Sequence, residues 1–238
     1  SNDVWVLLGL GDGTFQTPYR LPVGRSPRSP VVADFNSDGA PDVALVNSGD
    51  GTISVLYNSG DGRFGVVRQI LVGIEPTGLT AATFDSDSII DLVVADRSAG
   101  RFIPLLGLPQ GGFAAYPSVS PIAAPESALR ADLNGDGLPD IASYDDRLGV
   151  IAFWLNNPRG DYANSVLVHV GTGLAFLSSA RLDGRSGEDI VFANKYEDRV
   201  YTFRVNLDGS VSDVRVLADK ISPDGTTFAD FNNDGNLD

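Results

Sequence analysis

The sequence lacks cysteine and methionine altogether and contains a single histidine. Without cysteine, the chain can form no disulfide bond, thiolate metal site or cysteine nucleophile. It also lacks any run of about 18 apolar residues, the length that a membrane-spanning helix needs. Basic residues are few, since 17 Lys and Arg face 31 Asp and Glu, for a net charge of −14. Phosphate backbones and anionic lipids repel such a charge, so we expect neither a nucleic-acid partner nor membrane insertion.

Helix signals are absent as well. No window shows a capped amphipathic pattern over three turns, which argues against modules whose ion-binding loop lies between two helices. Turn-forming residues are plentiful instead, with 27 Gly and 14 Pro in 238 residues. The chain is 42% hydrophobic, enough to bury a substantial core. The composition therefore predicts a turn-rich globular protein.

The chain repeats itself at a constant step. The stretch ADFNSDGAPD has counterparts that together occupy residues 33–42, 82–91, 131–140, 180–189 and 229–238. The first loop position falls at 34, 83, 132, 181 and 230, so each step is 49 residues. A second landmark, the turns GDGTF, GDGRF, QGGF, RGDY and DGSV, keeps the same step. About five units therefore cover residues 1–238, which we expect to form a single domain.

The residue pattern of each unit predicts β-strands. In the second copy, the segments PVVADF, DVALVNS, TISVLYN and VVRQILVG are rich in Val, Ile and Leu and are bounded by turn residues. Four short strands repeating at 40 to 50 residues are typical of β-propeller blades, whereas β-helix repeats are far shorter. The sequence therefore predicts an all-β fold, a β-propeller of four-stranded antiparallel blades.

The third strand of each unit is apolar on both sides, as VWVLL, ISVLY, FIPLL, IAFWL and VYTFR show. A blade that stacks between two neighbours buries both of its faces, so we expect these strands to be sandwiched. Phe153 and Trp154 are accordingly predicted to lie in the core. The unit that spans the two termini lacks a counterpart of residues 43–49, and a ring of five blades would miss one strand. We therefore expect the chain to be a piece of a larger propeller.

The acidic stretch of the second copy has the opening of a calcium loop. Oxygen-bearing side chains occupy loop positions 1, 3, 5 and 9, namely Asp34, Asn36, Asp38 and Asp42. Gly39 at position 6 permits a sharp turn, and position 7 offers the backbone carbonyl of Ala40. Hard oxygen ligands favour calcium over zinc, and a flexible loop with carbonyl ligands favours calcium over magnesium.

Two further copies of the loop are complete. Asp and Asn form turns without any metal, which would explain one such loop. Turn formation does not require three mutually repelling carboxylates in each of three loops, so we expect three full calcium sites. The predicted ligands of the two further copies are Asp132, Asn134, Asp136, Leu138 and Asp140, and Asp230, Asn232, Asp234, Asn236 and Asp238.

The second acidic loop departs from the pattern. Thr83 replaces the acid at position 1 and Ser88 replaces the glycine at position 6. The remaining carboxylates, Asp85, Asp87 and Asp91, predict weaker or absent calcium binding.

The fourth acidic loop has arginines where acids would stand. Arg181 and Arg185 occupy positions 1 and 5, while Asp183 and Asp189 remain. We expect Arg185 to pair with Asp183 or Asp189 and so to supply the positive charge that an ion supplies elsewhere.

These loops and the strands around them resemble FG-GAP or VCBS-type repeats, the blades of integrin α-subunit propellers and of many bacterial surface proteins. The resemblance extends over nearly all of the chain. It implies a secreted or cell-surface propeller with structural calcium in the loops that join first and second strands. It also implies that partners bind on the opposite face.

No catalytic arrangement accompanies the acidic loops. The single histidine, His169, lies in a predicted strand where the second unit has Leu71, so we expect it to be a half-buried strand residue. No Ser-His-Asp set can be assembled, and the paired carboxylates are explained as ion ligands. An RGD sequence at residues 159–161 occupies a turn that reads GDG in other units, which favours repeat drift over a role in adhesion.

Two function classes remain. The chain is either a non-catalytic extracellular scaffold or recognition module for a protein or glycan, or an accessory domain of a larger secreted carbohydrate-active enzyme. Glycan binding would favour exposed aromatic side chains at matching places in successive blades. Tyr116, Tyr144 and Tyr196 do not recur at the 49-residue step, so the sequence gives glycan binding no firm support.

Overall fold

The computed structural model describes residues 2–85, 87–119, 124–157, 165–221, 223 and 225–231. All regular secondary structure in these ranges is β-strand, which confirms the all-β prediction. Among the same residues, no helix long and apolar enough to traverse a lipid bilayer is found. The chain forms two compact units, residues 1–83 with 87–120 and residues 84–86 with 121–238.

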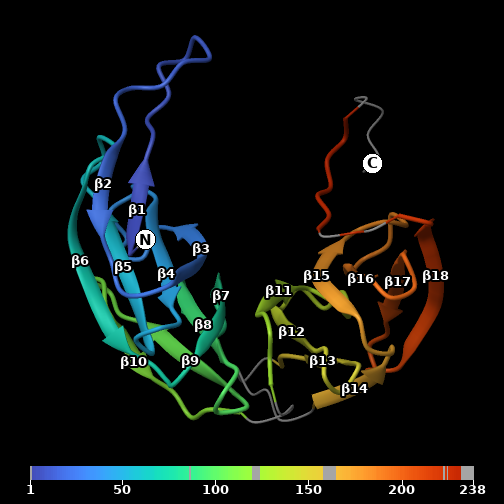
Figure 1. The fold of residues 1–238 in the computed structure, drawn as a ribbon. Coiled ribbons are helices and arrows are strands. Elements are labelled where there is room, and N and C mark those ends of the chain that lie inside the picture. The colour runs from blue at the N-terminus through green and yellow to red at the C-terminus, as the bar shows by residue number, and fades with distance from the viewer. Residues whose placement is uncertain are drawn as a thin grey trace. The chain divides into compact units, whose positions relative to one another are not determined.

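The described part of the first unit contains one two-stranded and two four-stranded antiparallel sheets (Figure 1). Its strands are β1 (Asp3–Val6), β2 (Tyr19–Pro22), β3 (Pro27–Ala33), β4 (Asp42–Asn47), β5 (Thr52–Asn58), β6 (Phe64–Leu71), β7 (Pro76–Ala82), β8 (Asp91–Asp96), β9 (Arg101–Gly107) and β10 (Phe113–Ala115). Strands β4 and β5 match the predicted segments 42–48 and 52–58 to within one residue, whereas β3 and β6 begin three and two residues before the predicted segments 30–35 and 66–73. Each four-stranded sheet follows chain order, as expected of a blade built from successive hairpins.

The described part of the second unit contains two more four-stranded sheets of the same kind. Its strands are β11 (Leu129–Ala131), β12 (Asp140–Asp145), β13 (Val150–Trp154), β14 (Ser165–His169), β15 (Leu174–Ala180), β16 (Asp189–Asn194), β17 (Arg199–Val205) and β18 (Val211–Asp219). Strands β4, β8, β12 and β16 begin at positions 42, 91, 140 and 189, so the structure keeps the 49-residue step of the sequence.

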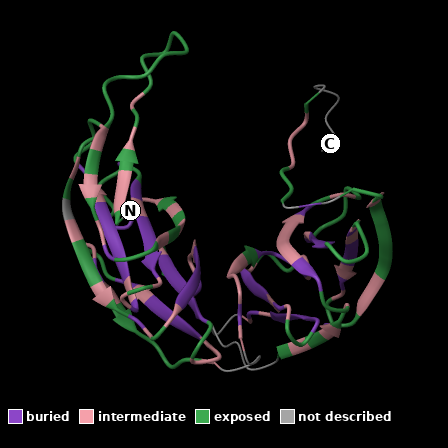
Figure 2. Cartoon of the chain, in the orientation of Figure 1, coloured by how far each residue is buried: buried purple, intermediate pink, exposed green. Residues whose placement is uncertain are grey.

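The two middle strands of each blade carry most of its buried residues (Figure 2). Every described residue of β8, β13 and β16 is buried, whereas β14 and β18 are exposed along much of their length. Phe153 and Trp154 of β13 are 0% and 2% exposed, which confirms that they belong to the core. Because successive side chains of a strand point to opposite faces, this burial means that both faces of these middle strands are shielded from water.

Within each unit, the blades pack through their first strands. In the first unit β7 packs on β3 and β4, and in the second unit β15 packs on β11 and β12. The resulting cores join residues of both blades, for example Val55 with Leu92, and Phe153 with Ile190. Burial of these side chains supplies the main driving force for folding.

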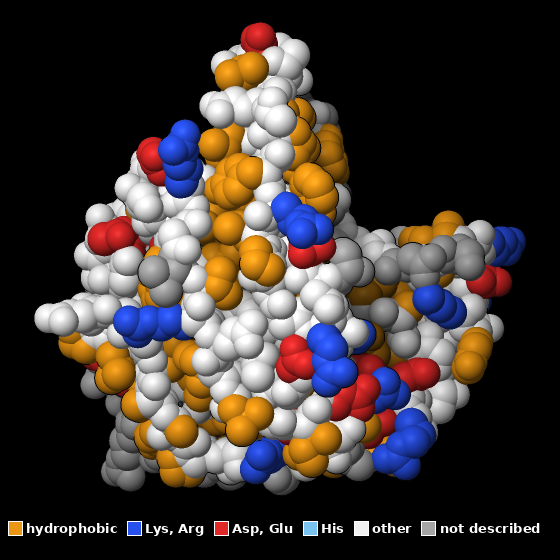
Figure 3. Space-filling model, turned by 60° about the vertical axis from the view of Figure 1, so that its left-hand side comes forward, with side chains coloured by type: hydrophobic (Ala, Val, Ile, Leu, Met, Phe, Trp, Pro, Cys, Tyr) orange, Lys and Arg blue, Asp and Glu red, His pale blue; other side chains and the backbone are white. Residues whose placement is uncertain are grey.

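The prediction for the segment VWVLL was wrong. Strand β1 ends at Val6, and Trp5 and Leu7 are 58% and 50% exposed rather than sandwiched. The physical reason is that β1 and β2 pair only with each other among the described strands, so the described part of this sheet has two strands where a blade has four. Leu10 and Phe15, between β1 and β2 in the sequence, are exposed as well. Figure 3 shows hydrophobic side chains along the projecting segment at the top of the view.

Candidate metal-binding loops

The acidic stretches join the first and second strands of the blades, as the resemblance implied. The first follows β3, the second follows β7, the third follows β11 and the fourth follows β15. Each loop therefore occupies the same place in its own blade. A β-sheet holds its strand ends rigidly, so the loops present their side chains from a fixed base.

The first acidic loop is organised by its own side chains. The backbone N–H of Gly39 donates a hydrogen bond to Asp34 Oδ2 (2.8 Å), and the N–H of Ala40 donates to Asp38 Oδ1 (2.8 Å). Asn36 donates to Asp38 Oδ2 through its side-chain amide (2.8 Å). Gly39 has φ of +86°, a conformation that favours glycine, which confirms the sharp turn predicted at position 6.

The third acidic loop repeats this arrangement. Asp132 accepts hydrogen bonds from the N–H groups of Gly135 (2.8 Å) and Gly137 (3.1 Å), and Gly137 has φ of +85°. Leu138 donates its N–H to Asp136 Oδ1 (2.8 Å). The two loops therefore hold equivalent oxygen atoms in equivalent places. Each carboxylate oxygen that accepts one hydrogen bond keeps a second lone pair, which remains available to a cation.

The aspartate at position 9 has a structural role that sequence reasoning missed. Asp140 is fully buried, and its two oxygens accept the N–H groups of Leu133 and Asn156, both at 2.8 Å. Asp42 likewise accepts from Phe35 (3.0 Å) and Asn58 (2.8 Å). This carboxylate ties the end of the first strand to the end of the third. The sequence does contain a signal of this role, because position 9 is the one loop position that is aspartate in all five copies.

Burial shifts the ionisation of the position-9 aspartates. Removal from water raises the pKa of Asp140 to about 6, although the two backbone N–H groups that it accepts oppose this shift. Burial also raises the pKa of Asp42 and of Asp189. The negative charges of Asp38 and Asp34 add to the rise at Asp42. A nearby cation would offset this cost of burying negative charge.

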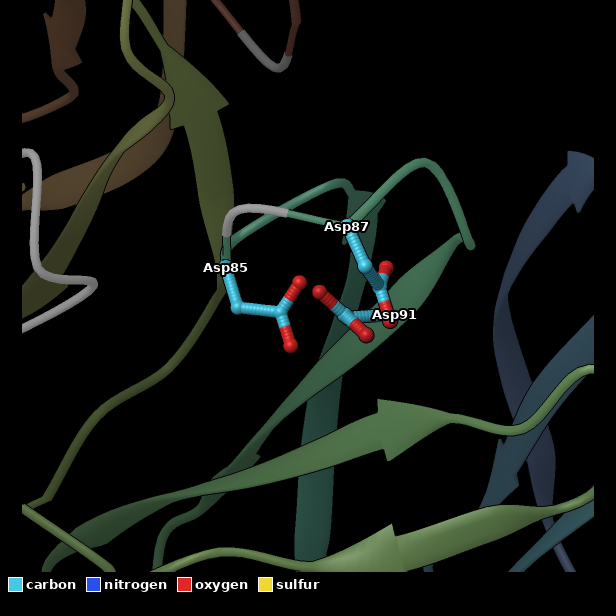
Figure 4. A group of neighbouring side chains, drawn as sticks. All are labelled: Asp85, Asp87 and Asp91. Carbon is cyan, nitrogen blue, oxygen red and sulfur yellow. The ribbon is translucent and has the colours of Figure 1, made fainter.

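The second acidic loop brings three carboxylates together. Oxygen atoms of Asp85, Asp87 and Asp91 all lie within 4.8 Å of one another. Figure 4 shows the three side chains, with their carboxylate groups turned toward a common space. Asp91 also accepts the N–H of Gly107 (2.7 Å), which fixes its side chain at the start of β8. Among the described residues, this is the group of acidic side chains that is gathered closely enough to hold a metal ion.

The donor set of this loop fits a hard cation. Calcium binds oxygen at about 2.3 to 2.6 Å, so two ligands on opposite sides of one ion lie roughly 5 Å apart. The separation of at most 4.8 Å among these oxygens matches that distance. Three adjacent carboxylates without a cation would repel one another. Sequence reasoning ranked this loop below the first and third, whose carboxylates the structure does not gather as closely.

The fourth acidic loop contains ion pairs. Arg185 Nε lies 3.6 Å from Asp183 Oδ2, which confirms the predicted pairing with Asp183. A closer cation was not predicted: Arg204 of β17 places Nη1 2.8 Å from the same oxygen. The pKa of Asp183 is lowered because the N–H of Arg185 donates to it, and the charges of Arg204 and Arg185 lower it further.

Other predicted residues have mixed outcomes. His169 lies at the end of β14 as expected, but it is exposed rather than half-buried, because residues of this outer strand alternate between the core and solvent. Tyr144 is partly buried and donates its hydroxyl to the carbonyl of Ala175 (3.2 Å), while Tyr116 and Tyr196 are exposed. Asn232, Asp234, Asn236, Asp238 and the RGD sequence at 159–161 lie outside the described residues.

The repeated blades and their acidic loops define a β-propeller built from one repeating unit. The model of the FG-GAP-like repeat matches residues 1–45, 34–94 and 84–143, which is more than half of the chain. The chain therefore belongs to the FG-GAP-like repeat family. Comparison with curated proteins gave no significant match.

Solved propeller structures are similar to the chain at low sequence identity. A putative 6-phosphogluconolactonase from Bacteroides fragilis has a TM-score of 0.64 at 12% identity, with 94% of this chain and 66% of that chain covered. An Agrocybe aegerita lectin that recognises non-reducing terminal N-acetylglucosamine has a TM-score of 0.63 at 17% identity, covering 92% and 61%. Virginiamycin B lyase from Staphylococcus aureus has a TM-score of 0.60 at 12% identity, covering 93% and 66%. The chain thus spans less than two thirds of these chains, and the likeness shows the fold alone.

Proposed function

We propose that this chain is a non-catalytic, calcium-binding β-propeller that works outside the cell as a scaffold or recognition module. The observation that carries the proposal is the repeated acidic loop, which places oxygen donors at the same point of successive blades. In the second loop, three carboxylates converge on one space. In the first and third loops, ordered carboxylates keep lone pairs for a cation. In this account calcium stabilises the loops and the strands that they join.

The proposed extracellular location follows from the proposed calcium affinity of the loops. Every donor in the loops is an oxygen, which suits calcium better than zinc. Loops of this flexible kind bind calcium with dissociation constants of about 10⁻⁴ to 10⁻³ M in extracellular modules. Extracellular calcium would fill such loops, whereas cytosolic calcium would leave them empty. The proposed ligands include the full set of the first, third and fifth loops and the weaker set of the second.

The partner is proposed to be a protein or a glycan. Propellers of this fold include a lectin and two proteins named as enzymes, so the fold by itself does not select between recognition and catalysis. The second candidate is an accessory propeller of a larger secreted carbohydrate-active enzyme, and it predicts the same calcium loops.

The proposal predicts a large effect of calcium on thermal stability. After chelation, calcium is titrated in while unfolding is followed by circular dichroism. Three sites that are filled a hundredfold above their dissociation constants would add roughly 2.7 kcal/mol each, so we expect the melting temperature to rise by about 10 °C or more. The triple variant Asp38→Ala, Asp136→Ala, Asp234→Ala should lose most of this rise.

A matched triple variant controls for the loss of charge. Asp12, Asp61 and Asp208 lie in other turns, and each accepts the N–H of the residue two positions later, as Asp38 and Asp136 do. Replacing these three by alanine removes the same charge but should leave the calcium response intact. An equal response in both triple variants, or no response of the native protein, would contradict the proposal.

A further inference from the structure

The fourth acidic loop is bound by an arginine from a different strand. Arg204 Nη1 lies 2.8 Å from Asp183 Oδ2, and Arg204 Nη2 donates to the carbonyl oxygen of Ser186 (3.0 Å). The guanidinium therefore joins loop positions 3 and 6 with two separate donors. The side chains of Arg204 and Asp183 are 17% and 22% exposed.

Arg204 has no counterpart in the other blades. One, two and three steps of 49 residues before it stand Leu155, Leu106 and Tyr57. The fourth loop is also the one that has arginines at positions 1 and 5 in place of acids. The cation on the strand and the loss of loop carboxylates thus occur together in a single blade. A guanidinium offers several fixed donors, so it can bind a carboxylate and a carbonyl at once, as a metal ion would.

The fourth loop also packs directly on the third. The N–H of Glu188 donates to the carbonyl oxygen of Asp132 at 2.6 Å. Gly135 approaches the backbone of Ser186 and Gly187 so closely that a Cβ on Gly135 would come within 3.0 Å of both. The backbone of the fourth loop therefore packs against one side of the third loop. An interaction that stabilises the conformation of the fourth loop also stabilises that of the third.

We propose that Arg204 is a built-in cation that replaces the metal ion of the fourth loop. This loop keeps its shape, and its contact with the third loop, without calcium. Arg185 adds charge from the loop itself, at the longer distance of 3.6 Å. That Arg204 takes the place of a metal ion rests on the proposed calcium binding of the equivalent loops, whereas its support of the fourth loop is tested in the absence of metal.

The test is amide hydrogen exchange in chelator, comparing the native protein with Arg204→Leu. The reporters are the N–H of Arg185, which donates to Asp183 Oδ1, and the N–H of Glu188, which donates to Asp132. Loss of a charge-assisted pair should make both amides exchange about tenfold faster or more. The matched control is Arg199→Leu, which removes another arginine of β17 with an equally short ion pair, 2.8 Å to Asp219. The control should leave both amides unchanged.

Two results would overturn the inference. The first is equal exchange of the reporter amides in Arg204→Leu and Arg199→Leu. The second is slower exchange of the Arg185 amide when calcium is added to the native protein, because it would place an ion in the fourth loop. If Arg204→Leu does not fold, Asp183→Asn removes the charge from the loop side. Because Asp183 itself accepts the N–H of Arg185, the Glu188 amide is then the reporter, and the same acceleration of its exchange is expected. Arg204→Lys keeps the positive charge but loses the two separate guanidinium donors. The reporter amides of this variant should therefore exchange at a rate between those of the native protein and Arg204→Leu.

Discussion

Replacing Asp140 by alanine is expected to destabilise the metal-free protein by about 3 kcal/mol. The carboxylate is fully buried and accepts the N–H groups of Leu133 and Asn156. Alanine would leave both donors buried without a partner, and each such group costs about 1 to 3 kcal/mol. Relief from burying a negative charge offsets part of this cost. Denaturant unfolding in chelator measures the change.

The control for Asp140→Ala lies in the same loop. Asp136 is exposed and accepts hydrogen bonds from Leu138 and Asn134 near the surface. In chelator, Asp136→Ala should change the free energy of unfolding by less than about 1 kcal/mol. If the two variants are equally stable in chelator, position 9 does not tie the strands together as described.

Truncating Phe35 to alanine is expected to cost about 3 to 5 kcal/mol. Phe35 stands at loop position 2, is fully buried, and belongs to the core that joins the two blades of the first unit. Its ring meets that of Phe113 edge-on, with centroids 5.9 Å apart. Alanine would leave a cavity at the base of the first acidic loop and also remove this contact between blades. Chemical denaturation followed by fluorescence or circular dichroism measures the loss.

The repeat supplies a control for Phe35→Ala at the same loop position. Phe231 lies four steps of 49 residues after Phe35, yet it is 72% exposed. Phe231→Ala should therefore change stability by less than about 0.5 kcal/mol. Equal losses for both variants would mean that burial of the loop anchor does not decide its contribution.

The sequence predicted the blades because their physical causes are local and repeated. Alternating apolar residues and glycine turns recur every 49 residues, so strand limits such as those of β4 and β5 follow from pattern alone. The turn at Gly39 was predictable for the same reason. The exposure of Trp5 was not, because it depends on which strands pair with β1. The residue pattern shows that a strand is apolar, but it does not show which other strands cover it.

The candidate site was predictable in its residue types and less so in its geometry. Loop spacing identified the donors, but it did not show that Asp140 accepts the backbone N–H of Asn156, sixteen residues away. It also ranked the loop of Asp85 and Asp87 low, although that loop gathers its carboxylates. Arg204 was missed because it comes from another strand. The contacts of Asp140 with Asn156 and of Arg204 with Asp183 join residues sixteen and twenty-one positions apart, and a single sequence does not record them.

Calcium binding by the acidic loops is tested most directly by a calorimetric calcium titration of the chelated protein. The number of ions bound by the native protein is compared with that of Asp38→Ala, Asp136→Ala, Asp234→Ala. We expect at least three ions for the native protein and at most one, in the second loop, for the triple variant. No binding at millimolar calcium, or the same number of ions in both proteins, would contradict it.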